Sequence, residues 1–121
     1  MIEIITENDR QKVKAVCDNA KVSYGDSVQL INCTDKSEVL GYALASFEKN
    51  ATVLYAKFCD TVIFDGLIRT VIHLASEKLI ENTFYSNKMD EDLLQKLGFI
   101  QNKDKKLLKP LSFMEKPCEK M

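Results

Sequence analysis

Two extended apolar runs lie close together in the middle of this 121-residue chain and constrain its fold more than any other feature. They cover Val39–Phe47 and Thr52–Phe58, and only Glu48-Lys49-Asn50-Ala51 separates them. A connection this short folds two consecutive strands back on each other as an antiparallel hairpin. The sequence therefore predicts a β-sheet at the centre of the molecule.

The hydrophobic period changes after this hairpin. From Asp65 onward, apolar residues recur every three and four positions, which is typical of a helix with one buried face. That face carries Ile68, Val71, Ile72, Ala75 and Leu79. We expect a central helix that follows the second strand of the hairpin and begins near Asp65.

The remaining segments predict more strands and two shorter helices. Ile2–Thr6 and Ser27–Thr34 read as strands, and the helix Gln11–Ala20 between them is predicted to have Thr6 as its N-cap. The later segments are a short strand at Asn82–Ser86, a short helix at Asp90–Leu97 that Gly98 closes, and a hairpin of Phe99–Gln101 with Leu107–Leu111.

This order of elements predicts an α+β fold with a mixed, mostly antiparallel twisted sheet of about six or seven strands, flanked by about three helices. We expect residues 1–113 to form a single domain and residues 114–121 to form a flexible tail. Cys118 lies in that tail, and its position allows either a reactive thiol or an ordinary mobile chain end.

Composition excludes several classes of function. Lys and Arg number 17 against 18 Asp and Glu, so no basic field favours nucleic acid, which we do not expect as a partner. No apolar stretch is typical of a membrane span or a signal peptide, so we expect a cytoplasmic protein with no membrane partner. Four widely spaced cysteines and a single histidine predict neither a metal site nor a disulfide framework.

Residues 87–99 resemble a motif of the GNAT superfamily of N-acetyltransferases. They read Asn-Lys-Met-Asp-Glu-Asp-Leu-Leu-Gln-Lys-Leu-Gly-Phe, and the family ending is Asn-x-x-Ala-x-x-Leu-Tyr-x-x-x-Gly-Phe. The matching positions are Asn87, Leu93, Gly98 and Phe99. Asp90 stands where the family has Ala, and Leu94 stands where it has Tyr. The resemblance implies a GNAT-like fold over about the C-terminal two-thirds of the chain.

The same resemblance implies acetyl-CoA or CoA as a cofactor. The family's pyrophosphate loop corresponds to the stretch before and within Phe64-Asp65-Gly66-Leu67-Ile68-Arg69, at the start of the helix. The residues placed against the cofactor are Phe58, Cys59, Phe64, Asp65, Gly66 and Asn87. Asp65-Gly66 is open to a second interpretation, an ordinary helix start with Asp65 as the N-cap, and Asn87 could equally form a structural turn.

Three features oppose that cofactor. The loop pattern Gln/Arg-x-x-Gly-x-Gly/Ala falls on Cys59, Val62 and Phe64, so its glycines are lost and side chains obstruct the approach of a ligand to the backbone. Acidic residues outnumber basic ones between Asp60 and Asp92, which repels an anion. Leu94 cannot donate the proton that the family tyrosine gives to the leaving thiolate.

The candidates for acid–base chemistry are correspondingly few. Tyr85 could replace the missing acid, and Glu48, Asp60 and His73 could serve as the base; each also has an ordinary structural role. We therefore expect a non-catalytic binding or partner-recognition module on a GNAT-like fold. The alternative is an acetyl-CoA-dependent N-acetyltransferase that acts on a primary amine of a small molecule or protein. The sequence identifies neither the partner nor the oligomeric state.

Overall fold

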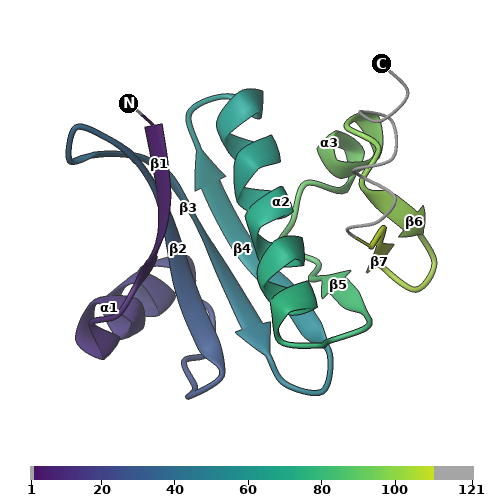
Figure 1. Cartoon of the computed structure of the whole chain (residues 1–121), viewed down its shortest axis with the longest axis horizontal. Coiled ribbons are helices and arrows are strands. Elements are labelled where there is room, and N and C mark those ends of the chain that lie inside the picture. The colour runs from purple at the N-terminus through teal and green to yellow at the C-terminus, as the bar shows by residue number, and fades with distance from the viewer. Residues whose placement is uncertain (1, 111–121) are drawn as a thin grey trace.

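The computed structural model describes residues 2–110, which form one seven-stranded sheet and three helices (Figure 1). The N-terminal part contains β1 (Ile2–Glu7), α1 (Arg10–Ala20), β2 (Val28–Asp35), β3 (Glu38–Phe47) and β4 (Ala51–Phe58). The C-terminal part contains α2 (Thr61–Glu77), β5 (Thr83–Tyr85), α3 (Glu91–Lys96), β6 (Ile100–Asn102) and β7 (Leu107–Leu108). This architecture confirms the predicted fold class.

The strands follow the order β1-β2-β3-β4-β5-β7-β6 across the sheet. Neighbouring strands pair antiparallel everywhere except β4 and β5, which run parallel and are joined through α2. The β3–β4 hairpin and the mostly antiparallel sheet are therefore confirmed. The single parallel pair lies at the centre of the sheet, beside the predicted site.

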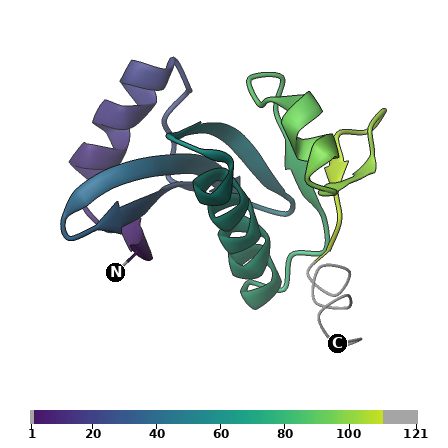
Figure 2. The same ribbon diagram turned by 90° about the horizontal axis from the view of Figure 1, so that it is seen from above.

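Helices α1 and α2 lie on opposite faces of the sheet (Figure 2). The α2 face carries the larger core, in which Phe64, Leu67, Ile68 and Val71 pack with inward residues of β2, β3 and β4 and with Leu94 of α3. The α1 face carries a smaller core. Burial of the apolar stripe of α2 is consequently what positions the junction between β4 and this helix.

Two helix starts differ from the predictions. The α1 helix begins at Arg10 with Asp9 as its N-cap, whose side chain accepts the Gln11 N–H at 3.0 Å, so the predicted Thr6 cap is wrong. Strand β1 continues through Thr6 to Glu7, and a residue paired within a strand cannot also cap the next helix.

The second helix starts one turn earlier than expected. It begins at Thr61 with Asp60 as its N-cap, and Asp65 lies inside the helix. The apolar run Val62-Ile63-Phe64 hides the helical period because exposed Val62 stands next to two buried residues. The capping role predicted for Asp65 therefore belongs to Asp60.

The C-terminal elements follow the sequence more closely. Gly98 follows the end of α3 with a positive φ of 84°, as predicted, whereas Asp90, predicted as the first residue of this helix, is its N-cap. The last hairpin is confirmed but shorter, because strand pairing ends at Leu108. The predicted tail at 114–121, with Cys118, lies outside the described residues. No helix within residues 2–110 is long and apolar enough to cross a membrane.

Candidate functional site

Strands β4 and β5 pair over only three residues each and then part. Ala51–Val53 pair with Thr83–Tyr85, whereas β4 continues to Phe58. Ser86 forms the last contacts between the two segments: its N–H donates to the Val53 carbonyl at 2.9 Å, and its hydroxyl donates to the Leu54 carbonyl at 2.7 Å. The pairing of these two strands therefore ends at Ser86.

A β-bulge lies at the point of parting. Tyr55 pairs with Leu44 and Val53 pairs with Ala45, so Leu54 is an extra residue on β4 with no partner on β3. Leu54 and Tyr55 consequently both pack toward the α1 face, while Val53 packs toward α2. A bulge re-aims the strand backbone locally, which is why bulges occur beside functional sites.

A pocket of about 390 Å³ opens beside this bulge. It is lined by Lys21, Val22, Ser23, Leu54, Ser86, Asn87 and Lys88. The first three residues follow α1, and the last three follow β5, so the pocket joins segments that are far apart in the sequence. Asn87, predicted to contact a cofactor, lies in its wall.

The N-terminus of α2 forms the other end of the predicted cofactor site, and a side chain already occupies it. Only Cys59 and Asp60 separate β4 from α2. The Asp60 carboxylate accepts the Ile63 N–H at 3.0 Å, and the Asp60 carbonyl accepts the Phe64 N–H at 3.2 Å. The Ile63 N–H is one of the groups at a helix start that would hold an anion, whereas the Phe64 N–H forms the first backbone bond within the helix. Asp60 therefore supplies the negative charge at this position itself.

Side chains fill the rest of the predicted loop. Phe64 is 0% exposed in the core and packs against Phe58 with tilted rings and centroids 4.6 Å apart, whereas Phe58 is partly buried and lines a surface pocket with Cys59. Val62 is 73% exposed on the first turn of α2. Gly66 lies in the second turn, and a Cβ there would meet the Ile4 side chain at 3.1 Å. Gly66 therefore gives α2 a close approach to β1.

A shallow pocket of about 360 Å³ remains beside the first turns of α2. Its lining comprises Thr61, Val62, Asp65, Gly66 and Leu97. The one charged residue among these is Asp65, whose carboxylate forms an ion pair with Arg69. Cys59 is exposed and lies instead in a pocket at the ends of β3 and β4. The predicted cofactor residues are thus divided between the core and separate surfaces.

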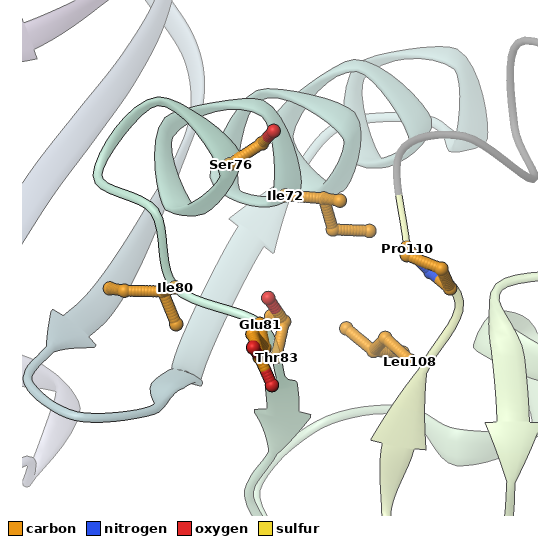
Figure 3. Close-up of a pocket in the computed structure, with 7 residues that line it drawn as sticks. All are labelled: Ile72, Ser76, Ile80, Glu81, Thr83, Leu108 and Pro110. Carbon is orange, nitrogen blue, oxygen red and sulfur yellow. The ribbon is translucent and has the colours of Figure 1, made fainter.

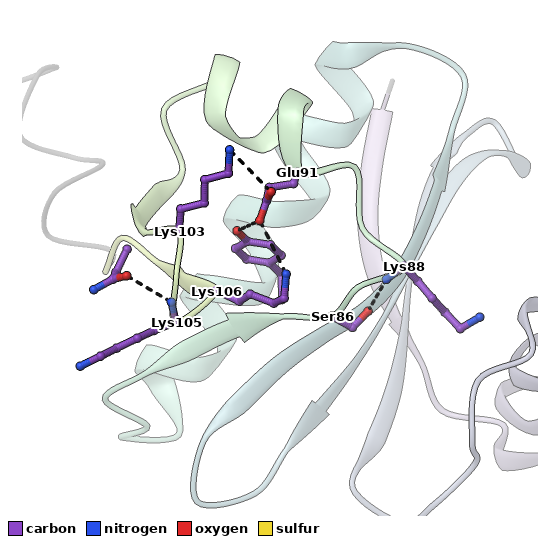
Figure 4. A network of polar contacts seen from close by, with 8 residues as sticks. Ser86, Lys88, Glu91, Lys103, Lys105 and Lys106 are labelled. Carbon is purple, nitrogen blue, oxygen red and sulfur yellow. Dashed lines mark hydrogen bonds and ion pairs between the residues drawn. The ribbon is translucent and has the colours of Figure 1, made fainter.

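Tyr85 belongs to a polar network that links β5, α3 and the β6–β7 turn (Figure 4). It is 2% exposed, and its hydroxyl donates to Glu91 Oε2 at 2.6 Å. Lys103 and Lys106 approach the same carboxylate at 3.8 and 3.7 Å. The Tyr85 hydroxyl is therefore committed to Glu91.

The electrostatics of this network follow from its geometry. Burial first, and then the hydrogen bond and the charge of Glu91, raise the pKa of Tyr85 to about 12. The hydrogen bond from Tyr85, aided by the two lysines, lowers the pKa of Glu91. A phenol with so high a pKa holds its proton tightly near neutral pH, which is the state needed for a structural donor.

The remaining base candidates lie apart from the parting strands. Glu48 is in the β3–β4 turn and accepts the Ser27 hydroxyl at 2.9 Å. His73 is exposed on α2, where its Nε2 lies 3.2 Å from Glu77. Within residues 2–110, no group of three His, Cys, Asp or Glu side chains is arranged to hold a metal ion.

A further pocket of about 180 Å³ lies at the opposite end of α2 (Figure 3). Its lining comprises Ile72, Ser76, Ile80, Glu81, Thr83, Leu108 and Pro110. Glu81 supplies the only charge in this lining. The pocket therefore offers a phosphate no cationic partner.

Sequence reasoning missed Lys21, Leu54 and Lys88. Their convergence depends on the β4 bulge and on where the chain leaves α1, and neither feature has a local sequence signal. The one available clue was the Ser86-Asn87 pair after a predicted strand, because polar residues at strand ends commonly line sites.

Comparisons with known proteins concern the fold. No protein-family model matches this sequence, and no curated protein matches it. Among solved structures, the aminoglycoside N-acetyltransferase AAC(6')-Iy in complex with CoA matches with a TM-score of 0.59 and 15% identity, covering 82% of this chain and 92% of that one. The chain has the fold of the GNAT acetyltransferases.

Two further structures agree. The ribosomal-protein-S18-alanine N-acetyltransferase from Escherichia coli matches with a TM-score of 0.62 and 12% identity over 88% of each chain. Ard1 from Thermoplasma volcanium matches with a TM-score of 0.56 and 14% identity over 88% of this chain and 92% of its own. The GNAT fold expected from residues 87–99 is thereby confirmed, and identities this low carry no information on activity.

Proposed function

We propose that this protein is a non-catalytic binding module built on the GNAT fold. One observation carries the proposal: the Asp60 carboxylate accepts the Ile63 N–H at the start of α2. An acyl-CoA pyrophosphate bound at this helix start would have to displace a fixed carboxylate and then approach Asp65 in the next turn. These two carboxylates support the proposal that the start of α2 does not hold the pyrophosphate of CoA.

The chemistry of acyl transfer also lacks a proton donor here. Leu94, at the position of the family tyrosine, is 0% exposed in the core. Tyr85 keeps its proton in the hydrogen bond to Glu91. A leaving thiolate would have no acid among these residues to receive a proton from. The carboxylate at the helix start and the lack of an acid among these residues thus both support a protein that does not catalyse acyl transfer.

An acetyl-CoA-dependent N-acetyltransferase that acts on a primary amine is the second candidate. The bulge at Leu54 and the parted strands favour it, because they leave strand backbone beside an open pocket, where it could polarise a thioester carbonyl. The CoA complex of AAC(6')-Iy supports the same candidate at the level of the fold.

Thermal unfolding in the presence of CoA separates the two candidates. A ligand at 100 times its Kd stabilises a protein by about 2.7 kcal/mol, which is a readily measured rise in Tm. We expect CoA and acetyl-CoA, each on the order of 1 mM, to leave the Tm of this protein unchanged. AAC(6')-Iy serves as the positive control. A saturable rise with CoA that phosphate-free pantetheine does not produce would overturn the binding-module proposal.

The proposal also places the protein in the cytoplasm. Its support is the state of the described cysteines: Cys17 and Cys33 are buried as free thiols, and Cys59 is exposed and free. Free thiols are typical of a reducing compartment.

A further inference from the structure

We propose that the pocket between Lys21 and Lys88 binds a small carboxylate that carries a short apolar arm. This inference rests on the proposed function and names the class of ligand that the module takes. The pocket lies on the α1 side of the bulge at Leu54 and is separate from the first turn of α2.

The Lys21 wall is fixed by backbone and side-chain hydrogen bonds. The Lys21 N–H donates to the Asp18 carbonyl at 3.3 Å, and the Val22 N–H donates to the Cys17 carbonyl at 2.9 Å. Arg10 holds the continuing loop through the Tyr24 hydroxyl and the Gly25 carbonyl. The backbone that presents Lys21 is therefore formed before any ligand arrives.

The Lys88 wall is fixed just as firmly. The Ser86 hydroxyl donates to the Leu54 carbonyl and accepts the Lys88 N–H at 3.2 Å. The Met89 N–H donates to the Ser86 carbonyl at 3.1 Å, and the Met89 side chain is buried in the core. Figure 4 shows the Lys88 side chain directed away from the Glu91 network. Lys88 is thus presented on a rigid turn toward solvent.

The ammonium groups of Lys21 and Lys88 have no partner among the described residues. Within residues 2–110, neither Lys21 nor Lys88 forms a side-chain hydrogen bond or an ion pair. No acidic residue lines the pocket, and the nearby Asp90 carboxylate is occupied as the N-cap of α3. The pocket therefore concentrates positive charge in a chain whose net charge is −1.

The other lining residues define the rest of the ligand. Val22 and Leu54 are half-buried and form an apolar surface between the two lysines. The side chains of Ser23 and Asn87 are exposed donors at the rim. A carboxylate complements the positive charge and the donors of this lining, and an alkyl arm covers its apolar residues. A bare inorganic anion would leave that surface exposed to water.

Three ligands of equal length test this assignment by their head groups. Hexanoate, hexan-1-ol and hexylamine are titrated separately into the 15N-labelled full chain, with the amide signals of Val22, Leu54 and Lys88 as readouts. We expect hexanoate to produce saturable shifts with the lowest Kd and hexylamine to produce the weakest. A Kd for hexylamine equal to or below that for hexanoate would overturn the assignment.

Lysine variants then test whether the charges of Lys21 and Lys88 contribute to the binding of hexanoate. We expect Lys21→Gln and Lys88→Gln each to raise the Kd for hexanoate by about three- to fivefold and to leave that for hexan-1-ol unchanged. Lys36→Gln is the matched control, because Lys36 has φ of 52° against 58° for Lys21 and lies in the β2–β3 turn. An unchanged Kd for hexanoate in both pocket variants would refute the site.

The two proposals fail in different ways. Failure of hexanoate to shift the pocket amides overturns only the carboxylate site. A CoA-dependent shift of the Val62 and Ile63 amides overturns the binding-module proposal, whatever hexanoate does.

Discussion

The two ends of the region that the GNAT fold offers to a ligand differ sharply in this protein. At the start of α2, the Asp60 carboxylate accepts the Ile63 N–H, and the adjacent shallow pocket of about 360 Å³ has Asp65 as its one charged residue. At the parting of β4 and β5, a bulge lies beside a pocket of about 390 Å³ that is lined by Lys21 and Lys88, neither of which forms an ion pair within residues 2–110. The two ends therefore differ in charge: carboxylates lie at the helix start, and lysines lie at the parting of the strands.

The difference shows which features depend on topology and which on single residues. The parting of β4 and β5 follows from the lengths of the two strands, because β5 ends at Tyr85 whereas β4 continues to Phe58. An anion site at a helix start depends on free N–H groups, and one capping carboxylate is enough to occupy it. An opening set by the sheet and an anion site set by one side chain can therefore vary independently on the same fold.

Truncation of Phe64 has the largest expected effect on this comparison. Phe64→Ala removes a ring that is 0% exposed and packs against Phe58, and we expect the free energy of unfolding to fall by about 3–5 kcal/mol. Urea denaturation measures this change. The control is Val62→Ala, two residues away and 73% exposed, with an expected loss below about 0.5 kcal/mol. Equal, small losses would mean that the Phe64 ring is not packed in the core at the start of α2.

Gly41 tests how tightly the end of β4 is packed against α2. A Cβ at Gly41 would lie 2.7 Å from the Lys57 carbonyl oxygen and 2.9 Å from the Ile63 side chain. We expect Gly41→Ala to destabilise the protein by about 1–3 kcal/mol in thermal or urea unfolding. Gly25→Ala meets nothing within 4 Å and serves as the control. A neutral Gly41→Ala would show that β4 and α2 can separate easily.

Tyr85→Phe sharpens the assignment of Tyr85 as a structural donor. Loss of the hydrogen bond to Glu91 is expected to lower the free energy of unfolding by about 1–2 kcal/mol near neutral pH. The pKa of Glu91 is lowered in the folded state, so the difference between wild type and variant should be present above the unfolded pKa of Glu and vanish as the pH falls through the folded value.

The stabilising effect of the same hydrogen bond should also be lost at alkaline pH. The folded pKa of Tyr85 is raised to about 12, so its contribution is present below the unfolded pKa and is lost as the pH rises through that folded value. Urea titrations across the pH range check both limits. A difference between wild type and Tyr85→Phe that does not change with pH would contradict the assignment.

Substitutions of Asp60 and Asp65 have the smallest expected effects on stability, and their order shows which of the two residues caps α2. Asp60→Ala removes the N-cap of α2 and should cost about 1 kcal/mol of stability. Asp65→Ala removes an ion pair with Arg69 within the helix and should cost less than about 0.5 kcal/mol. The reverse order in urea denaturation would restore Asp65 as the cap and reopen the helix start as a ligand site.

The sequence predicted the fold where local signals were strong. The short connection at residues 48–51 specified the β3–β4 hairpin, and Gly98 marked the end of α3. The start of α2 was predicted one turn late because Ile63 and Phe64 interrupt the visible period. Thr6 was predicted as a cap because nothing local indicates that β1 extends to Glu7.

The candidate site was less predictable because its parts meet only through tertiary structure. The bulge at Leu54 depends on the register of β4 against β3, which no local pattern sets. Lys21 and Lys88 line one pocket, although 66 positions separate them in the sequence. Burial of Phe64 and capping by Asp60 likewise appear only once α2 is placed on the sheet.

The amide signals of Val62 and Ile63 test most directly whether the Asp60 carboxylate prevents CoA from binding at the start of α2. CoA is titrated into the 15N-labelled protein, with pantetheine as the phosphate-free comparison. Because the Asp60 carboxylate already holds the Ile63 N–H, we predict that neither ligand shifts these two amides. A saturable shift with CoA, absent with pantetheine, would show that the start of α2 binds pyrophosphate and would contradict the account.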